Sequence, residues 1–199
     1  IAVLIAVPCG ILSAAKRNSF IDVIFSFLSV IGKAMPNFWI GIMLILFFAV
    51  SLRWLPVSGR GGFEHLILPA VTVGIGLAAQ MTRLIRSSML EILNEDYIRT
   101  ARSKGVRESL VVCLHAFRNG LIPVVTVIGL QFTSLIGGTL VTETVFAWPG
   151  LGMLLVTAVN MRDMAVVEAA VFIIALAVII CNLLTDLVYR LLDPRIKNQ

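Results

Sequence analysis

The stretch FIDVIFSFLSVIGKAMPNFWIGIMLILFFAV, residues 20–50, determines how this chain can fold. Its only charged residues are Asp22 and Lys33. A membrane-crossing helix needs about 20 apolar residues, because it spans ~30 Å of hydrocarbon at about 1.5 Å per residue. The stretch is too long for one straight crossing. Pro36, which lacks a backbone N–H donor, predicts a kink or break near its middle.

The rest of the chain has the same character. Of its 199 residues, 59% are hydrophobic and 14% are charged, whereas a soluble domain is about 25% charged. Lipid offers no hydrogen-bond partners, so the backbone groups of a membrane span must pair with each other, in a helix or a closed β-barrel. No run alternates like a barrel strand, so we expect helices. The sequence predicts one domain over residues 1–199, an all-α, polytopic transmembrane helical bundle with five spans. Besides 20–50, the apolar runs are residues 1–15, 66–84, 121–142 and 165–189.

The first run starts without a Met or a basic leader, so we expect a further helix before it. Orientation follows from the distribution of Lys and Arg between the two sides of the membrane. One side receives only Arg53, Arg60 and Arg162. The other side receives Lys16, Arg17, Arg83, Arg86, Arg99, Arg102, Lys104, Arg107, Arg118, Arg190, Arg195 and Lys197. Basic residues concentrate in cytoplasmic loops, so we expect the loop at about 87–119 and the C-terminus to be cytoplasmic.

The loop at about 87–119 carries a helical pattern of its own. Apolar residues recur near the 3.6-residue period at Met89, Leu90, Leu93, Tyr97, Ile98 and Ala101. Asn94 is a candidate N-cap, and Gly105 stands where a left-handed C-cap belongs. A second short helix is predicted over about 108–116.

Three interpretations of this loop compete. It is a charged segment that only fixes topology, a patch for lipid headgroups or nucleic acid, or a docking helix for a cytoplasmic protein. Headgroup binding favours a nearly all-basic run, but acidic residues are interspersed here. The mixed charge and the small Ala101 side chain favour docking to a protein groove.

ARSKG at residues 101–105 and HAFRNGLIP at 115–123 resemble the EAA loop of ABC-importer permeases. Arg99 replaces the acid of that motif, and the spacing after Gly105 is longer. Both departures are typical of the dipeptide, oligopeptide and nickel branch. The stretches MPNFWIGIML, WLPVSG, LPAVTVG, ETVFAWPGLG, NMRD and LLDPRI also resemble that branch, in the same order.

This resemblance implies a permease subunit of an ATP-driven, binding-protein-dependent importer in the bacterial inner membrane. It would move short peptides, or nickel or another small solute, by alternating access. The implied partners are a second homologous permease, an extracytoplasmic binding protein and two ABC ATPase subunits that bind ATP and Mg²⁺. Residues at about 143–164 would form an outer-face segment. The implied ATPase-coupling residues are Asp96, Tyr97, Arg99, Thr100, Ala101, Arg102, Lys104, Gly105, His115, Arg118, Asn119 and Pro123.

Polar residues within the apolar runs are candidates for a transport pathway or gate, because a charge at mid-bilayer costs about 2.5–3.5 kcal/mol. Lys33 and Glu168 are expected to face a polar interior, whereas Asp22 is expected at an interface. The candidates are Lys33, Pro36, Gln80, Gln131, Glu143, Trp148 and Glu168.

The sequence shows no Walker motif, no convergent catalytic set and no His/Cys cluster, and GIGLAA at residues 74–79 lies inside an apolar run rather than in a dinucleotide site. We therefore expect no enzyme activity, no cofactor bound by this chain and no nucleic-acid partner. A secondary transporter or channel is the alternative from another class, although such proteins usually contain inverted repeats.

The predicted topology is testable by single-cysteine labelling in a background lacking Cys9, Cys113 and Cys181. Positions 58–62 should react with an impermeant reagent from outside the cell, and positions 103–108 only after permeabilisation. The reverse pattern would contradict the orientation and every assignment that depends on it.

Overall fold

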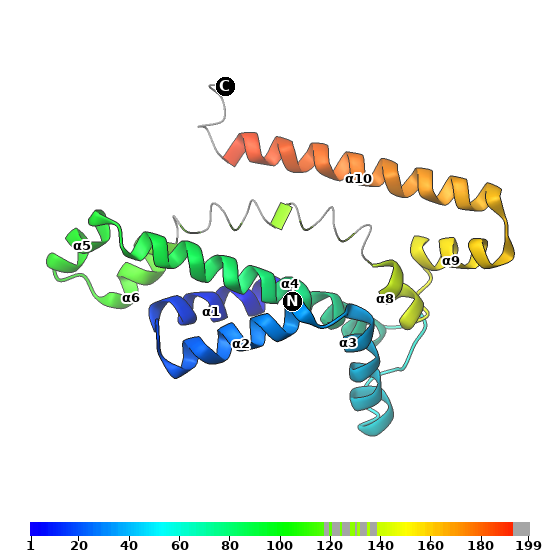
Figure 1. Cartoon of the computed structure of the whole chain (residues 1–199), viewed down its shortest axis with the longest axis horizontal. Helices are drawn as coiled ribbons and strands as arrows, with labels where there is room; N and C mark the ends of the chain where they lie inside the picture. Colours follow the sequence, from blue (N-terminus) through cyan, green and yellow to red (C-terminus); the bar gives the residue numbers. More distant parts are fainter. Residues whose placement is uncertain are drawn as a thin grey trace. The chain divides into compact units, whose positions relative to one another are not determined.

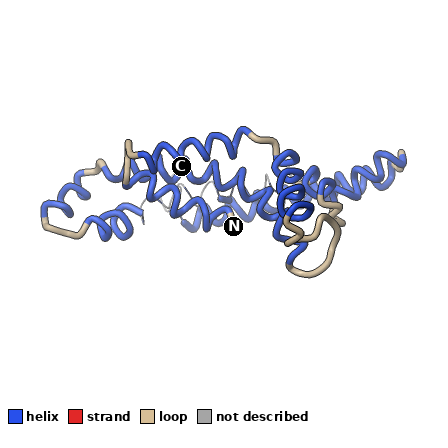
Figure 2. Tube along the Cα trace, turned by 90° about the horizontal axis from the view of Figure 1, so that it is seen from below, coloured by secondary structure: helices blue, strands red, loops and turns tan. Residues whose placement is uncertain are grey.

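The computed structural model describes residues 1–117, 120, 124, 128–129, 131, 135 and 139–192, and these residues form helices and no β-strand (Figures 1 and 2). They divide into two compact units. The first contains the described residues within 1–34 and 77–128, and the second those within 35–76 and 129–191. Helix α4 (Glu64–Leu93) contributes its C-terminal part to the first unit and its N-terminal part to the second.

The first unit packs around the C-terminal part of α4. Its other elements are α1 (Ala2–Ala15), α2 (Phe20–Ala34), α5 (Asp96–Ser103), α6 (Glu108–Leu110) and the π-helix η2 (Val111–Ala116). Ile85 and Met89 of α4 are fully buried together with Ile98 of α5 and Val111 of η2. Burying such a side chain contributes roughly 1.5–3 kcal/mol. This cluster therefore fixes the two loop helices against the end of α4.

Helices α1 and α2 form a hairpin (Figure 1), and α1 comes close to α4 at a glycine. A Cβ atom built on Gly10 would lie 2.7 Å from the Cβ of Ile85 and 3.1 Å from the carbonyl oxygen of Thr82. Real Cβ atoms do not approach that closely. Gly10 is thus the residue that allows α1 to pack on α4, as small residues do in membrane bundles.

The second unit has a smaller core. It consists of residues 64–76 of α4 together with α3 (Asn37–Leu44), the π-helix η1 (Ile45–Ser51), α8 (Leu140–Val145), α9 (Leu151–Met161) and α10 (Met164–Leu192). Ala49, Leu68 and Phe146 form its buried centre. The N–H of Gly59 donates to the carbonyl oxygen of Phe146 at 2.9 Å, which ties the loop after η1 to the end of α8.

Two helices of the described residues are long and apolar enough to cross a membrane, at 64–93 and 164–185. Helices α2 and α3 with η1 would provide a third if they form one broken span. The first apolar run forms the 14-residue helix α1, which is shorter than a crossing. Most of the fourth predicted run, 121–142, lies outside the described residues. The predicted all-α architecture is confirmed, and the count of five spans is not.

Two boundaries compare directly with the sequence prediction. Helix α2 ends at Ala34 and α3 begins at Asn37, so the break predicted at Pro36 is confirmed. The third apolar run ends at residue 84, and helix α4 continues unbroken beyond it to Leu93. The apolar residues Met89, Leu90 and Leu93 therefore belong to α4 and not to a separate loop helix. Met89 is fully buried in the core of the first unit, which accounts for the continuation.

The close approach at Gly10 predicts a stability effect. Gly10→Ala should destabilise the protein by about 1–3 kcal/mol, because the added methyl group overlaps Ile85 and α1 must move. Gly76→Ala is the matched control. Its Cβ would meet only the Asn37 side-chain oxygen at an ordinary 3.4 Å, and alanine favours a helix over glycine by roughly 0.5–1 kcal/mol. Thermal unfolding in detergent measures both, and equal midpoints for Gly10→Ala and wild type would contradict the packing.

Candidate functional site

Helix α5 ends in a hydrogen-bonded C-cap built around Gly105. The N–H of Gly105 donates to the carbonyl oxygen of Arg102 at 2.9 Å, and the N–H of Val106 donates to that of Ala101 at 3.3 Å. These two bonds define a Schellman motif, which requires a left-handed residue after the C-cap. Gly105 has φ +77° and supplies that conformation without steric strain. The C-cap predicted at Gly105 is confirmed.

The same motif anchors the loop to the core. Ala101 and Val106, the two residues joined by the longer hydrogen bond, are half-buried and pack against the cluster that contains Ile98 and Val111. One face of α5 is therefore held by the protein itself. The opposite face is exposed and carries Asp96, Tyr97, Arg99, Thr100, Ser103 and Lys104.

An ion pair closes the turn between α5 and α6. Arg102 Nη2 donates to Glu108 Oε1 at 2.7 Å, and Arg102 Nε donates to Glu108 Oε2 at 3.0 Å. These hydrogen bonds from the Arg102 guanidinium hold the pKa of the Glu108 carboxyl below its ordinary value. The pair therefore supports the turn at pH values above the ordinary glutamate pKa of about 4.3 and loses this effect as the pH falls through the lowered pKa.

Several predicted loop residues take places that the sequence did not indicate. The N-cap of α5 is Glu95, not Asn94, whose side chain instead donates to the carbonyl oxygen of Leu90 at the end of α4. Ala101, which the sequence indicated as the contact face for a partner protein, packs against the buried core of the first unit. The second short helix appears at 108–116, as α6 and η2. The backbone of His115 lies in η2, while Arg118, Asn119 and Pro123 lie outside the described residues.

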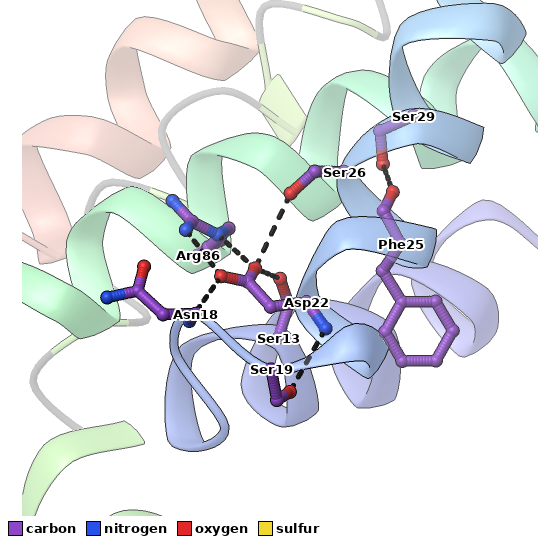
Figure 3. Close-up of polar contacts among 8 residues, drawn as sticks. All are labelled: Ser13, Asn18, Ser19, Asp22, Phe25, Ser26, Ser29 and Arg86. Carbon is purple, nitrogen blue, oxygen red and sulfur yellow. Dashed lines mark hydrogen bonds and ion pairs between the residues drawn. The ribbon is translucent and has the colours of Figure 1, made fainter.

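An ion pair between the buried Asp22 carboxylate and the partly exposed Arg86 guanidinium joins the α1–α2 hairpin to α4 (Figure 3). Arg86 Nε and Nη2 donate to Asp22 Oδ1 and Oδ2 at 2.7 and 2.8 Å. The hydroxyl of Ser13 also donates to Oδ1, and the N–H of Asn18 donates to Oδ2 at 3.0 Å. Asp22 is only 4% exposed, so its carboxylate is enclosed by the protein itself. The partner lies 64 residues away, and no local sequence pattern indicates such a pair.

Glu143 caps helix α9, which begins eight residues later in the chain, at Leu151. Its Oε2 accepts hydrogen bonds from the N–H groups of Gly152 and Met153 at 2.8 and 3.2 Å, in the first turn of α9. Orphan N–H groups and the helix dipole both favour a carboxylate there. A Cβ on Gly150 would overlap the Glu143 carboxylate, and a Cβ on Gly152 would overlap the Leu140 backbone, so both glycines allow the close approach that the cap needs. The stretch ETVFAWPGLG thus folds back on its own first residue.

The remaining pathway candidates are distributed over both units. Lys33 Nζ donates to Gln80 Oε1 at 2.9 Å, so α2 and α4 bring these two candidates together. Pro36 is the N-cap of α3. The N–H of Trp148 donates to the carbonyl oxygen of Glu143 at 2.8 Å.

Glu168 is exposed on α10, and Gln131 is half-buried. Glu143 also borders a cleft of about 480 Å³ between α8, α9 and α10. Apart from Glu143 and Thr139, the residues that line this cleft are apolar. None of these positions tests the predicted pathway role. Among the described residues no group of three or more His, Cys, Asp or Glu side chains could hold a metal ion.

Comparison with known proteins places these features in a family. Residues 6–198 match the model of the family described as "Binding-protein-dependent transport system inner membrane component". The chain is 50% identical over 196 residues to a glutathione transport system permease protein, GsiC, of Pectobacterium atrosepticum. That match covers 98% of this chain and 64% of the relative. A putative peptide permease protein of Brucella suis is 47% identical over 99% of this chain and 65% of its own length.

The chain therefore spans about 64% of the length of the first of these relatives. Its fold is similar to that of a solved chain from the MetNI methionine ABC transporter in an inward-facing conformation, with a TM-score of 0.79 and 19% identity. The likeness covers 96% of this chain and 88% of that chain. At this identity it supports the fold and nothing finer.

The C-cap of α5 predicts a conformational requirement at Gly105. A Cβ atom there would meet nothing within 4 Å, so a substitution costs only backbone strain. Gly105→Val should cost about 1–3 kcal/mol and expose the amides of 105 and 106 to hydrogen exchange. Gly105→Asn is the control, because asparagine tolerates the left-handed region better than other non-glycine residues. Equal exchange in the two variants would contradict the role assigned to the positive φ.

Proposed function

The chain belongs to the family of binding-protein-dependent transport system inner membrane components, and from that membership we propose that it is the permease subunit of an ATP-driven importer of short peptides. It serves as a transport subunit, and ATP and Mg²⁺ are bound by separate ATPase subunits. The complete assembly contains a second homologous permease, two such ATPases and an extracytoplasmic binding protein. The C-terminus and the loop that carries α5 lie on the cytoplasmic side.

The two faces of α5 are the observation that carries this proposal. The helix is fixed to the protein by Ile98, Ala101 and Val106 and presents an exposed face of mixed charge. A loop that only fixed topology would need basic residues but neither a buried anchor nor a capped helix. The anchor makes a displacement of α5 pull on α4, through the buried contact with Met89. The exposed face is suited to a cleft on an ATPase subunit.

This arrangement supports a mechanism of alternating access. Closure of the ATPases on ATP would move α5, and the helices packed on it would move with it. Lys33 and Gln80, which meet between α2 and α4, are our candidates for a polar lining of the pathway. An ionisable residue inside an apolar run is costly unless it faces a cavity or a partner.

Peptide import is favoured over other cargo by the relatives, one named for glutathione transport and one for peptides. Glutathione is itself a short peptide. Nickel or another small solute is the alternative cargo, but the described residues contain no cluster of metal-ligating side chains. A secondary transporter or channel is the alternative mechanism, and it would have no use for an ATPase-docking helix.

The docking face of α5 is tested by reversing its charge. Arg99→Glu with Lys104→Glu changes two exposed residues and should leave membrane insertion normal. Like charges that meet at an interface cost several kcal/mol, so ATPase affinity should fall by about tenfold or more and peptide uptake should be lost. The measurements are ATPase co-purification and uptake of a labelled peptide.

Arg60→Glu is the matched control, because Arg60 is also exposed but lies in the loop predicted on the outer side. It should leave ATPase co-purification unchanged. Full assembly and full uptake in the Arg99/Lys104 variant would show that α5 does not dock an ATPase. ATP-independent uptake driven by an ion gradient would instead favour the secondary transporter.

A further inference from the structure

The α1–α2 hairpin and the loop that carries α5 attach to the same part of α4. Ile98 of α5 packs in one buried cluster with Met89 and Ile85 of α4. On the hairpin side, Gly10 lies against Ile85, and Asp22 pairs with Arg86. Residues 85–89 are little more than one helical turn. A movement of the loop therefore reaches the hairpin through a short, rigid segment.

Apolar packing alone does not fix how the hairpin sits on that segment. The buried residues that α1 contributes are small, such as Ala6, Gly10 and Ala14. Apolar attraction is non-directional, so it determines how close the hairpin lies to α4 more than how the hairpin is oriented. A bidentate guanidinium–carboxylate pair instead fixes both distance and orientation. The Asp22–Arg86 pair supplies the constraint that the apolar contact lacks.

The surroundings of this pair hold the Asp22 side chain in one orientation. A buried ion pair is often no more stabilising than well-packed apolar side chains of similar volume, because both charges lose their water. Yet four groups besides Arg86 contact Asp22: the hydroxyls of Ser13 and Ser26, the N–H of Asn18 and, at its own N–H, the hydroxyl of Ser19 (Figure 3). The other ion pairs of the described residues join near neighbours in the chain.

We infer that Asp22 and Arg86 are positioning residues for transport, forming the joint that makes the α1–α2 hairpin move together with the ATPase-docking loop. This inference rests on the proposed function. If the joint loosens, the ATPases still bind α5 and still hydrolyse ATP, but the hairpin no longer follows. The defect is then one of coupling, with ATP consumed and little peptide moved.

The experiment measures the distance between the hairpin and the loop during the cycle. Spin labels are attached after Arg17→Cys and Arg107→Cys, two exposed positions outside the docking face of α5, in the background without native cysteines. The full-length permease is assembled with its partner subunits in lipid nanodiscs. Pulsed electron paramagnetic resonance then compares the nucleotide-free and the ATP-bound states. Peptide uptake and ATP hydrolysis are measured in proteoliposomes.

With the joint intact, the distance between the labels should be the same in both states. In Arg86→Gln the distribution of label distances should broaden and its mean should change with nucleotide, while ATPase co-purification stays normal. The ATP hydrolysed per peptide should rise about fivefold or more, the lower end of typical coupling between sites. Arg86→Lys keeps the positive charge but cannot bind both carboxylate oxygens in the geometry of a guanidinium, so its ATP consumption per peptide should lie between those of wild type and Arg86→Gln. Ser26→Ala, which removes only a 3.4 Å contact, should behave as wild type.

Two results would overturn the inference. One is a label distance that changes with nucleotide in a wild-type complex that transports, which leaves the proposed function intact. The other is unchanged coupling in Arg86→Gln. If that variant does not fold, Asp22→Leu with Arg86→Met keeps an apolar packed contact and must show the same loss of coupling. A wild-type chain that binds no ATPase would instead overturn the proposed function together with this inference.

Discussion

Burial of the apolar side chains on the last two turns of α4 is the interaction on which the first unit depends. Ile85 and Met89 are the shared neighbours of α1, α5 and η2. Helix α5, with eight residues, and η2, with six, are too short to be stable alone, because isolated helices under about 12–15 residues are marginal in water. Their conformation is therefore a consequence of packing on α4. The continuation of α4 past the predicted end of the span provides that surface.

Two carboxylates in the described apolar helices are surrounded by hydrogen-bond donors. The Asp22 carboxylate receives the Arg86 fork and further hydrogen bonds from the hairpin. The Glu143 carboxylate receives two backbone N–H groups at the start of α9. An unpaired polar group in such surroundings would cost several kcal/mol. Each acid joins two helical segments, Asp22 the hairpin to α4 and Glu143 α8 to α9.

Features governed by local stereochemistry could be read from the sequence. The break at Pro36, the C-cap at Gly105 and the helical segment at 108–116 all follow from neighbouring residues, and the structure confirms them. The end of α4 could not be read, since the predicted boundary rested on where apolar residues give way to charge. The Asp22–Arg86 pair could not be read either. It joins residues 64 positions apart, and periodicity carries no information on such partners.

Helix α10 makes the protein sensitive to the thickness of its membrane. Its apolar segment, residues 164–185, is 22 residues long, and few of its residues are buried by the rest of the described chain. At about 1.5 Å per residue it measures roughly 33 Å, close to the ~30 Å of an average hydrocarbon core. A thinner bilayer forces it to tilt, and a thicker one must thin around it. A change in the acyl-chain length of the surrounding lipids therefore imposes a mismatch on this helix, which tilting or local deformation of the bilayer has to absorb.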